Sequence, residues 1–390
     1  MNTGARGKGR VLICAGGTGG GIYPALSAAN ELQKMGVGAQ DILWVGTKGE
    51  MEESLVPRAG LTLETIAGGA IVGVAPHVAL ANAAKLLWSV VKSLRLITQF
   101  KPNVMFMTGG YMAAPVTIAS WLKRIPITIY LPDVEPGKSI RFAVRFAKKI
   151  GTTTDGSKRF IPEDKMVVTG YPVREEIKTA VSLTKSDALA TFDLKPDRKT
   201  LFVFGGSRGA LAINNGLMAI LPDLLQTIQV IHISGTLTWP QVEANSKNIP
   251  AELREYYRPY PYLHEKMGAA FRAADLVLAR AGASMLGECP TFGLPSILLP
   301  LTFAWRYQKV NADYLTERGA AVQLTDEQLP EKMLPTIMAL MEDNGRLAQM
   351  QSAAKALDKP NGTANLAHMI LQTAKGVANT RLGNKELGGA

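Results

Sequence analysis

Two glycine-rich loops, one near the start of the chain and one just past its middle, constrain the fold of this 390-residue sequence most strongly. The first, AGGTGGGIYP over 15–24, follows the apolar run VLICA, and the second, GGSRGA over 205–210, follows LFVF. An apolar strand, a glycine loop and a helix in succession are typical of α/β domains with a parallel sheet. Their double occurrence predicts two similarly built domains, each long enough to bury its own core.

Apolar runs and helical patterns alternate through the first half of the chain. Proline suits the first turn of a helix and glycine suits its end, so the first helix is expected to begin at Pro24 and to stop before Gly36. The expected strands are 11–15, 42–46, 104–108 and 127–131, and the expected helices are 24–35, 50–58, 78–99 and 112–123.

The same pattern restarts at Leu201, after a polar stretch over 182–199. These features predict an N-terminal domain over 1–175 and a C-terminal domain over 176–360. The segment 361–376 has a helical pattern and could pack back on the first domain. The last residues, 377–390, are polar and glycine-rich, so we expect them to form a disordered tail.

Composition limits the classes of partner. The chain is 47% hydrophobic and 19% charged, which excludes general disorder, and its net charge of +11 favours acidic partners. Lysine and arginine do not alternate with aromatic residues as in a nucleic-acid groove, so no nucleic acid is expected. The two cysteines and four histidines show no metal-ligand spacing, so neither a metal nor another cofactor is expected.

Both glycine loops precede a helix, whose N-terminus attracts negative charge. The second loop adds the hydroxyl of Ser207 and the cation of Arg208, which would suit a diphosphate. The alternative is that each loop is only a tight strand-to-helix turn. Two such loops are more informative than one, because together they could surround a single ligand.

A third motif, ARAGASMLGECPTFGLP over 279–295, carries an acidic residue, Glu288, near the start of a predicted helix. A carboxylate at that position can accept both hydroxyls of a ribose, although it could equally complement the helix dipole. Further on, Gln308 and Asn311 lie one helical turn apart on one face. Their amides suit sugar hydroxyls or a polar surface.

The ordered set of motifs resembles the MurG family of N-acetylglucosaminyltransferases. It comprises GGTGG followed by Pro24, then TGGYMAAP, GYPVR, GGSRGA, RAGAS with Glu288 and GLP, and Gln308 with Asn311. The resemblance implies an α/β chain of two Rossmann-like domains facing a cleft, the glycosyltransferase B fold. It further implies metal-independent, inverting transfer of N-acetylglucosamine from UDP-GlcNAc to lipid I (undecaprenyl-diphospho-N-acetylmuramoyl-pentapeptide), which gives lipid II for peptidoglycan.

The resemblance also assigns roles to individual residues. The first loop would face the acceptor diphosphate and the donor through Thr18, Gly19 and Gly20. Arg174 and Ser207 would bind the donor diphosphate, and Gln308 would bind hydroxyls of its sugar. Leu263 would lie at the edge of the uracil. The uridine would be held by the run Ala283, Ser284, Met285, Leu286, Gly287 and Glu288, with Glu288 on the ribose.

Two departures from the family pattern fall where the acceptor hydroxyl should lose its proton. Gly21 stands where the family usually has histidine, and Tyr130-Leu131-Pro132-Asp133 stands where it usually has His-Glu-Gln-Asn. Asp133, just past an apolar strand, is the first candidate for a substitute base and also a candidate substrate-binding residue, and Glu135 is the second. The alternative is that both acids cap the helix beginning near Gly137.

The segment 82–100 predicts how the chain would reach a lipid acceptor. Lys85, Lys92 and Arg95 share one arc of a helical wheel, which suits the anionic lipids of the cytoplasmic membrane leaflet and a peripheral location there. The alternative is a core-facing helix with a solvated basic stripe. Other functions stay open: a UDP-GlcNAc 2-epimerase, a transferase with a diacylglycerol acceptor, or a sugar-nucleotide-binding pseudoenzyme.

Overall fold

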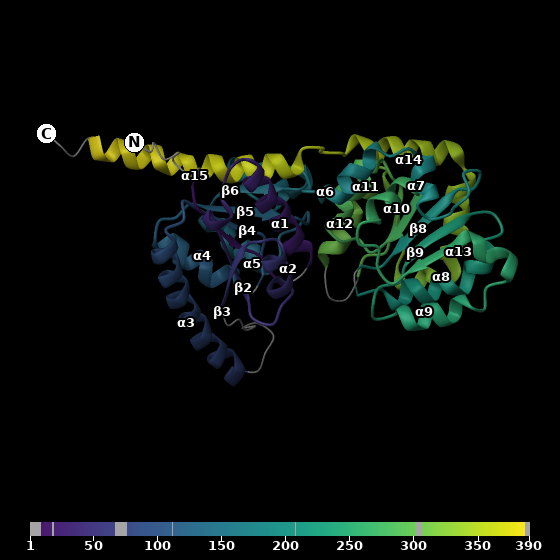
Figure 1. Cartoon of the computed structure of the whole chain (residues 1–390), viewed down its shortest axis with the longest axis horizontal. Coiled ribbons are helices and arrows are strands. Elements are labelled where there is room, and N and C mark those ends of the chain that lie inside the picture. The colour runs from purple at the N-terminus through teal and green to yellow at the C-terminus, as the bar shows by residue number, and fades with distance from the viewer. Residues whose placement is uncertain are drawn as a thin grey trace. The chain divides into compact units, whose positions relative to one another are not determined.

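The computed structural model describes residues 9–17, 19–66, 76–110, 112–206, 208–301 and 306–386. The chain divides into two compact units (Figure 1). The first unit comprises Met1–Pro172 and Asn361–Ala390, and the second comprises Val173–Pro360. Each unit is built on its own parallel sheet, because each carries its own series of apolar strands separated by helices.

The first unit holds a seven-stranded sheet in the order β3-β2-β1-β4-β5-β6-β7. All of its strand pairs are parallel, and every residue of the central strands is buried, as their unbroken apolar sequences require. The strands are β1 (Val11–Cys14), β2 (Ile42–Thr47), β3 (Thr62–Ile66), β4 (Val104–Met107), β5 (Ile127–Leu131), β6 (Ala147–Thr152) and β7 (Met166–Val168).

Helices cover both faces of this sheet. One core layer lies under α1 and α15, and the other lies under α3, α4 and α5. The yellow α15, from the end of the chain, lies beside α1 (Figure 1). The helices are α1 (Gly19–Lys34), α2 (Glu52–Arg58), α3 (Pro76–Phe100), α4 (Ala113–Leu122), α5 (Lys138–Ala143) and α15 (Gly362–Glu386).

Two helix boundaries differ from the expectations. Helix α1 begins at Gly19, so Pro24 lies inside it and not at its first turn. The structure also continues α15 to Glu386, so a helix occupies most of the segment that was expected to be a disordered tail. Within the described part of the chain, no helix combines the length and apolar character needed to cross a membrane.

The second unit holds a six-stranded parallel sheet in the order β10-β9-β8-β11-β12-β13. Its strands are β8 (Thr200–Phe204), β9 (Gln229–Ile233), β10 (Tyr257–Tyr260), β11 (Leu276–Ala279), β12 (Ser296–Leu298) and β13 (Ala321–Gln323). Its helices are α6 (Glu175–Lys178), α7 (Lys185–Ala190), α8 (Leu211–Leu224), α9 (Trp239–Ser246), α10 (Met267–Ala273), α11 (Met285–Phe292), α12 (Arg306–Thr316), α13 (Leu329–Glu342) and α14 (Asn344–Ala356).

Both sheets reverse their strand order at one point, between β1 and β4 in the first unit and between β8 and β11 in the second. At such a point the loops that leave the two strands diverge to opposite faces, and ligands of open α/β sheets bind there, outside the carboxyl ends of the strands. The two glycine-rich loops leave β1 and β8, so each lies at the reversal point of its own sheet.

Candidate functional site

The first glycine-rich loop is fixed from two sides. The indole Nε1–H of Trp44 donates to the Ala15 carbonyl at 2.8 Å, and the Thr108 hydroxyl donates to the Gly21 carbonyl at 2.9 Å. The loop after β4 also approaches closely, since a Cβ on Gly110 would lie 3.0 Å from the Gly16 carbonyl oxygen. These contacts place Gly19 at the N-terminus of α1, where an anion is stabilised.

The structure gives the candidate residues of this loop a defined setting. Gly19 and Gly20 form the first turn of α1, and Thr18 lies outside the described residues. Gly21 follows in the same turn, and a Cβ there would lie 3.2 Å from the Thr108 hydroxyl oxygen. Thr108 thus packs tightly against the position where the family usually has histidine.

Asp133 lies two residues past the end of β5 and is half-buried. Thr153, just past the end of β6, holds the loop that carries Asp133. Its hydroxyl donates to the Pro132 carbonyl at 2.7 Å and lies 2.7 Å from the Tyr130 hydroxyl. Burial raises the pKa of Tyr130 well above its ordinary value, so this phenol stays neutral. Asp133, in contrast, keeps part of its surface exposed at the carboxyl end of β5.

Glu135, the second candidate base, has a different environment. Its side chain is fully buried and pairs with Arg141 of α5, whose Nε–H also donates to the Pro136 carbonyl at 2.9 Å. A carboxylate that neutralises a guanidinium and has no exposed surface cannot reach a substrate hydroxyl without breaking that pair. The geometry therefore argues against Glu135 as the base.

The second glycine-rich loop depends on glycine at two positions. Gly206 and Gly209 have φ of +96° and +90°, which favours glycine. A Cβ on Gly209 would overlap the carbonyl oxygen of Ser234, in the loop that follows β9. The loop therefore needs a bare backbone at 209 to pack against its neighbour. Ser207 lies outside the described residues.

This loop forms one wall of a pocket of about 550 Å³ at the carboxyl ends of β8 and β11. Arg280, the first residue after β11, lines the pocket beside Gln308 and Asp326. The Arg280 guanidinium donates to the two oxygens of Asp326 at 2.6 and 2.9 Å, and to the Leu299 carbonyl at 3.2 Å. The pocket thus combines a helix N-terminus with a fixed guanidinium, and both suit phosphate oxygens.

The two amides of α12 hold neighbouring loops. The Gln308 side-chain oxygen accepts from the Leu301 N–H at 3.1 Å, and the Asn311 amide donates to the Ala281 carbonyl at 3.1 Å. Asn311 is fully buried, whereas Gln308 borders the pocket. The amide N–H₂ group of Gln308 can donate hydrogen bonds, and Asn311 fixes the loop after β11.

Glu288 lies in the first turn of α11, with 5% of its surface exposed. Burial raises its pKa, while the nearby Arg174 guanidinium and the Ser284 hydroxyl partly offset this rise. Arg174 thus lies on the same side of the unit as Glu288, and it also pairs with Glu176 at 3.3 Å. Residues Ala283, Ser284, Met285, Leu286 and Gly287 lead into this turn of α11.

Leu263 lies in the stretch after β10 and is buried, with 5% of its surface exposed. It is not among the residues that line the 550 Å³ pocket. The structure therefore brings Gln308 and the second loop together, and separately brings Glu288 close to Arg174. It shows no such contact for Leu263 within the described residues.

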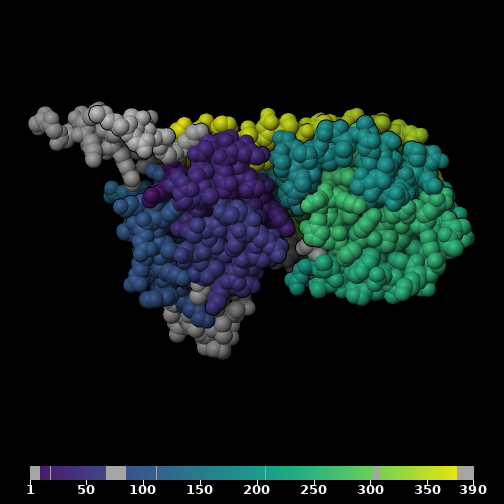
Figure 2. Space-filling view, in the orientation of Figure 1, coloured from purple at the N-terminus to yellow at the C-terminus, as the bar shows by residue number. Residues whose placement is uncertain are grey.

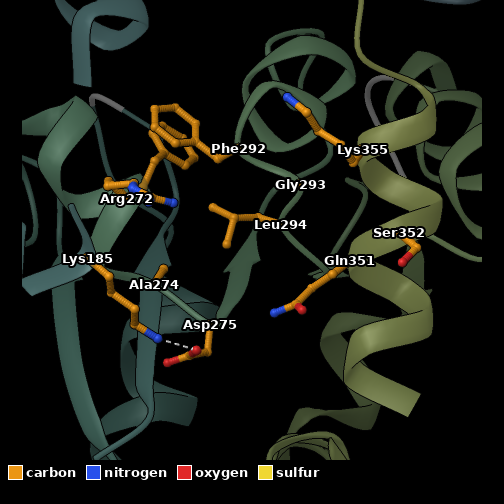
Figure 3. A pocket seen from close by; sticks show the side chains of 11 residues that line it. Lys185, Arg272, Ala274, Asp275, Phe292, Gly293, Leu294, Gln351, Ser352 and Lys355 are labelled. Atoms are coloured by element: carbon orange, nitrogen blue, oxygen red, sulfur yellow. Dashed lines mark hydrogen bonds and ion pairs between the residues drawn. The ribbon is translucent and has the colours of Figure 1, made fainter. Parts of the chain in front are cut away.

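A second pocket of the same unit lies at the opposite, amino ends of the strands (Figure 3). Its charged residues are already engaged: Lys185 pairs with Asp275, and Lys355 donates to Asp358 at 2.8 Å and to the Thr291 carbonyl at 2.9 Å. The Arg272 Nε–H donates to the Leu183 carbonyl at 2.7 Å. Because ligands of such sheets bind at the carboxyl ends, the pocket with Arg280 is the better candidate.

Sequence reasoning missed the pair of Arg280 with Asp326. The available signal was a cation placed directly after a buried apolar strand, at the edge where open-sheet sites form. Its partner could not be read from the sequence, because Asp326 is 46 residues away. Across the described ranges, no three or more His, Cys, Asp or Glu side chains gather closely enough to hold a metal ion.

Comparison with known proteins identifies the family of this chain. The glycosyltransferase family 28 N-terminal domain matches residues 11–152, and the family 28 C-terminal domain matches residues 200–366. A relative from Halalkalibacterium halodurans is 33% identical over 94% of this chain and 100% of its own length. It is named UDP-N-acetylglucosamine–N-acetylmuramyl-(pentapeptide) pyrophosphoryl-undecaprenol N-acetylglucosamine transferase, the activity of MurG. The chain belongs to the MurG family of glycosyltransferases.

Further MurG relatives agree with this assignment. One from Desulforamulus reducens carries the same name and is 36% identical over 93% of this chain and 98% of its own. The crystal structure of Acinetobacter baumannii MurG is 26% identical, with a TM-score of 0.74 over 93% of this chain and 99% of that one. A UDP-GlcNAc 2-epimerase from Neisseria meningitidis, at 16% identity and a TM-score of 0.60, shares the fold alone. The two-domain glycosyltransferase B fold is thus confirmed.

Proposed function

We propose that this member of the MurG family transfers N-acetylglucosamine from UDP-GlcNAc to lipid I, giving lipid II for peptidoglycan. The observation that carries the proposal is the pocket of the second unit, where the second glycine loop, Arg280 and Gln308 meet. A helix N-terminus and a guanidinium bind a diphosphate, and a free amide binds sugar hydroxyls. Full-length similarity to relatives of that name supports the choice of sugar and acceptor.

We assign the donor to the second unit. The diphosphate would lie over the N-terminus of α8, with Arg280 and Arg174 supplying positive charge and Ser207 a hydroxyl. Glu288 would accept the ribose hydroxyls, and burial of its carboxylate makes each such hydrogen bond stronger than in water. Gln308 would bind the transferred sugar. The uridine would lie against the residues that lead into α11.

The reaction would be an inverting displacement. The acceptor hydroxyl attacks the anomeric carbon from the face opposite UDP, the bond to the diphosphate breaks, and a base removes the hydroxyl proton. We assign the base to Asp133, which lies past the end of β5 and keeps some exposure. The first loop, with Gly19 and Gly20 at the N-terminus of α1, would hold the acceptor diphosphate.

The leaving diphosphate needs positive charge, and we assign this charge to Arg280, Arg174 and the N-terminus of α8, not to a metal ion. Arg280 is held by two hydrogen bonds to Asp326, so its guanidinium is already oriented before the donor binds. We therefore expect transfer to continue in EDTA at the rate measured before chelation. Loss of transfer in EDTA, with recovery on adding magnesium or manganese, would overturn this part of the proposal.

Helix α3 suggests how the enzyme meets a lipid acceptor. Its buried face carries small polar residues, Ser89 and Ser93, whose hydroxyls donate to backbone carbonyls of the preceding turn. Three of its large apolar residues, Leu87, Trp88 and Val91, expose 70%, 62% and 41% of their surface, whereas Ile97, nearer the end of the helix, is buried in the core. Large apolar side chains gathered on an exposed helix face are suited to an apolar environment.

Basic residues accompany this apolar face, on a segment that Figure 2 draws in blue according to its residue numbers. Lys85 and Arg95 are exposed, and the Arg95 guanidinium lies 6.0 Å from the Trp88 ring centre. Helix α4, which packs on α3, ends with the exposed Trp121 and Leu122. We propose that this α3–α4 face docks on anionic lipids of the cytoplasmic leaflet, where apolar side chains insert and cations meet headgroups.

Vesicle binding tests this docking face. The double variant Leu87→Ser/Trp88→Ala should bind phosphatidylglycerol vesicles at least about tenfold more weakly, because the membrane would no longer bury two large apolar side chains. Leu237→Ser is the matched control, since Leu237 exposes 66% of its surface in the second unit. Wild-type binding should also weaken at high salt. Equal binding by the double variant and the control would place the docking face elsewhere.

A further inference from the structure

Glu52, the first residue of α2, is a buried carboxylate to which the proposed mechanism gives no role. It has no exposed surface and lies against the first glycine loop, at the carboxyl ends of β1 and β2. Its Oε1 accepts a hydrogen bond from the Thr47 N–H at 2.9 Å. Its Oε2 has no hydrogen-bond partner within the described residues. Buried polar atoms are nearly always paired, so this oxygen calls for a functional explanation.

Two glycines leave the space that this carboxyl group occupies. A Cβ on Gly16 would overlap Oε1 and lie 2.9 Å from Cδ and 3.2 Å from Oε2. A Cβ on Gly46 would lie 2.6 Å from the Cγ of Glu52. The carboxyl group therefore contacts the loop after β1 while it is hydrogen-bonded to Thr47, the last residue of β2. Glu52 thus joins the first glycine loop to the carboxyl end of β2, beside the proposed acceptor site.

A purely architectural role would use both oxygens. Oε1 alone completes the link to Thr47, and leaving Oε2 unpaired in a buried position costs about 1–3 kcal/mol. The backbone of the first loop lies close to Oε2, since a Cβ on Gly16 would be 3.2 Å from this oxygen, and Gly17 follows at a φ of +85°. A loop rich in glycine can turn one of its N–H groups toward this acceptor.

We propose that Glu52 is a positioning residue for the acceptor. When the acceptor diphosphate binds at the N-terminus of α1, one N–H of the first loop, which already contacts Glu52, turns toward Oε2 and donates to it. The hydrogen bond fixes the loop in its binding geometry without any contact between Glu52 and the acceptor. The inference rests on the proposed function, because it takes lipid I as the ligand of this loop.

The variant Glu52→Gln isolates the free oxygen. Its amide oxygen still accepts from Thr47, but its N–H₂ group replaces Oε2 and cannot accept a hydrogen bond. We expect the KM for lipid I to rise about tenfold or more, the loss of one hydrogen bond to a charged group. The KM for UDP-GlcNAc should stay within about twofold, since that site lies in the second unit, and the melting temperature should not fall. Glu53→Gln, an exposed neighbour, is the matched control.

Hydrogen exchange gives a readout that does not depend on transfer. Lipid I should protect the amides of residues 15–21 in the wild type and in Glu53→Gln, but not in Glu52→Gln. Equal protection in all three proteins, or an unchanged KM for lipid I in Glu52→Gln, would overturn the proposal. A lower melting temperature of Glu52→Gln with both KM values unchanged would also overturn the proposal, because it would show that Glu52 only stabilises the fold. Failure of the proposed function would appear differently, as no transfer to lipid I by the wild type.

Discussion

The variant Gly209→Ala tests the geometry of the second loop most sharply. Gly209 has a φ of +90°, and a Cβ there would overlap the backbone carbonyl oxygen of Ser234 and lie against the Thr238 hydroxyl. Gly206 in the same loop has a similar φ of +96°, but a Cβ there would meet no atom within 4 Å. The pair therefore separates backbone strain from steric overlap within one loop.

The expected costs follow from these contacts. A left-handed conformation costs a residue with a Cβ about 1–2 kcal/mol, and this is the whole cost expected for Gly206→Ala. Overlap with a backbone atom that cannot rotate away adds about 1–3 kcal/mol, so Gly209→Ala should cost about 2–5 kcal/mol. To relieve this overlap, the second glycine loop would have to move away from Ser234. Because the loop lines the pocket, Gly209→Ala should also raise the KM for UDP-GlcNAc.

Urea titration with hydrogen exchange of peptides from β8 and β9 measures the stability of the second unit separately. This matters because a chain with two units does not unfold as a single two-state system. The expected result is a lower urea midpoint for Gly209→Ala than for Gly206→Ala. If the two variants were equally stable, the close approach of the two loops would not be the reason for glycine at 209.

Three further predictions concern titratable groups. Burial lowers the pKa of His232 to about 3, so the free energy of unfolding should fall as the pH drops below about 6.5, the pKa of histidine in the unfolded chain. The expected decrease is about 2 kcal/mol between pH 7 and pH 5. Urea titrations of His232→Asn should not show this pH dependence. Glu288→Gln should raise the KM for UDP-GlcNAc about 10–100-fold at pH 8. Because burial raises the pKa of Glu288, the wild-type KM should approach that of the variant as the pH falls, beginning above the usual range for glutamate; a pH-independent ratio of the two KM values would contradict the ribose assignment. Asp133→Asn should lower kcat at least about 100-fold with the donor KM within about twofold, whereas a kcat within a few-fold of wild type would remove Asp133 from the mechanism.

The central strands and the order of the elements could be predicted from the sequence. VLICA, VMFMT and ITIYL are unbroken apolar runs, and strands of that kind are buried on both faces of a parallel sheet. Strand β3, with the sequence TLETI, was not predicted, because it lies at the sheet edge and most of its residues keep some exposure. A local pattern identifies a strand only where burial dictates its composition.

Helix α1 shows a second limit. The sequence pattern predicts Pro24 in the first turn of the helix, yet the helix begins at Gly19. Proline within a helix normally removes a hydrogen bond and is unfavourable. Here the glycine residues of the first loop enter the helix, because the hydrogen bond from Thr108 to the Gly21 carbonyl fixes their position. That bond joins residues 87 positions apart and cannot be read from local sequence.

The candidate site divides in the same way. Glycine loops, Glu288 and Gln308 could be predicted, because the ordered motifs of the family name them. The pair of Arg280 with Asp326 and the free oxygen of Glu52 could not, since both depend on which distant residues the fold brings together. The exposure of Leu87, Trp88 and Val91 on α3 could not be predicted either, because the helical pattern alone does not show which face packs on the sheet.

Transfer of labelled N-acetylglucosamine tests the central claim most directly. The full chain would be incubated in EDTA with UDP-[¹⁴C]GlcNAc and vesicles containing lipid I, and parallel samples would contain diacylglycerol or no acceptor. The account predicts that label appears in lipid II, with no labelled glycolipid from diacylglycerol and no epimerised UDP-sugar. Label on diacylglycerol, conversion of UDP-GlcNAc to its 2-epimer, or donor binding without any transfer to lipid I would contradict it.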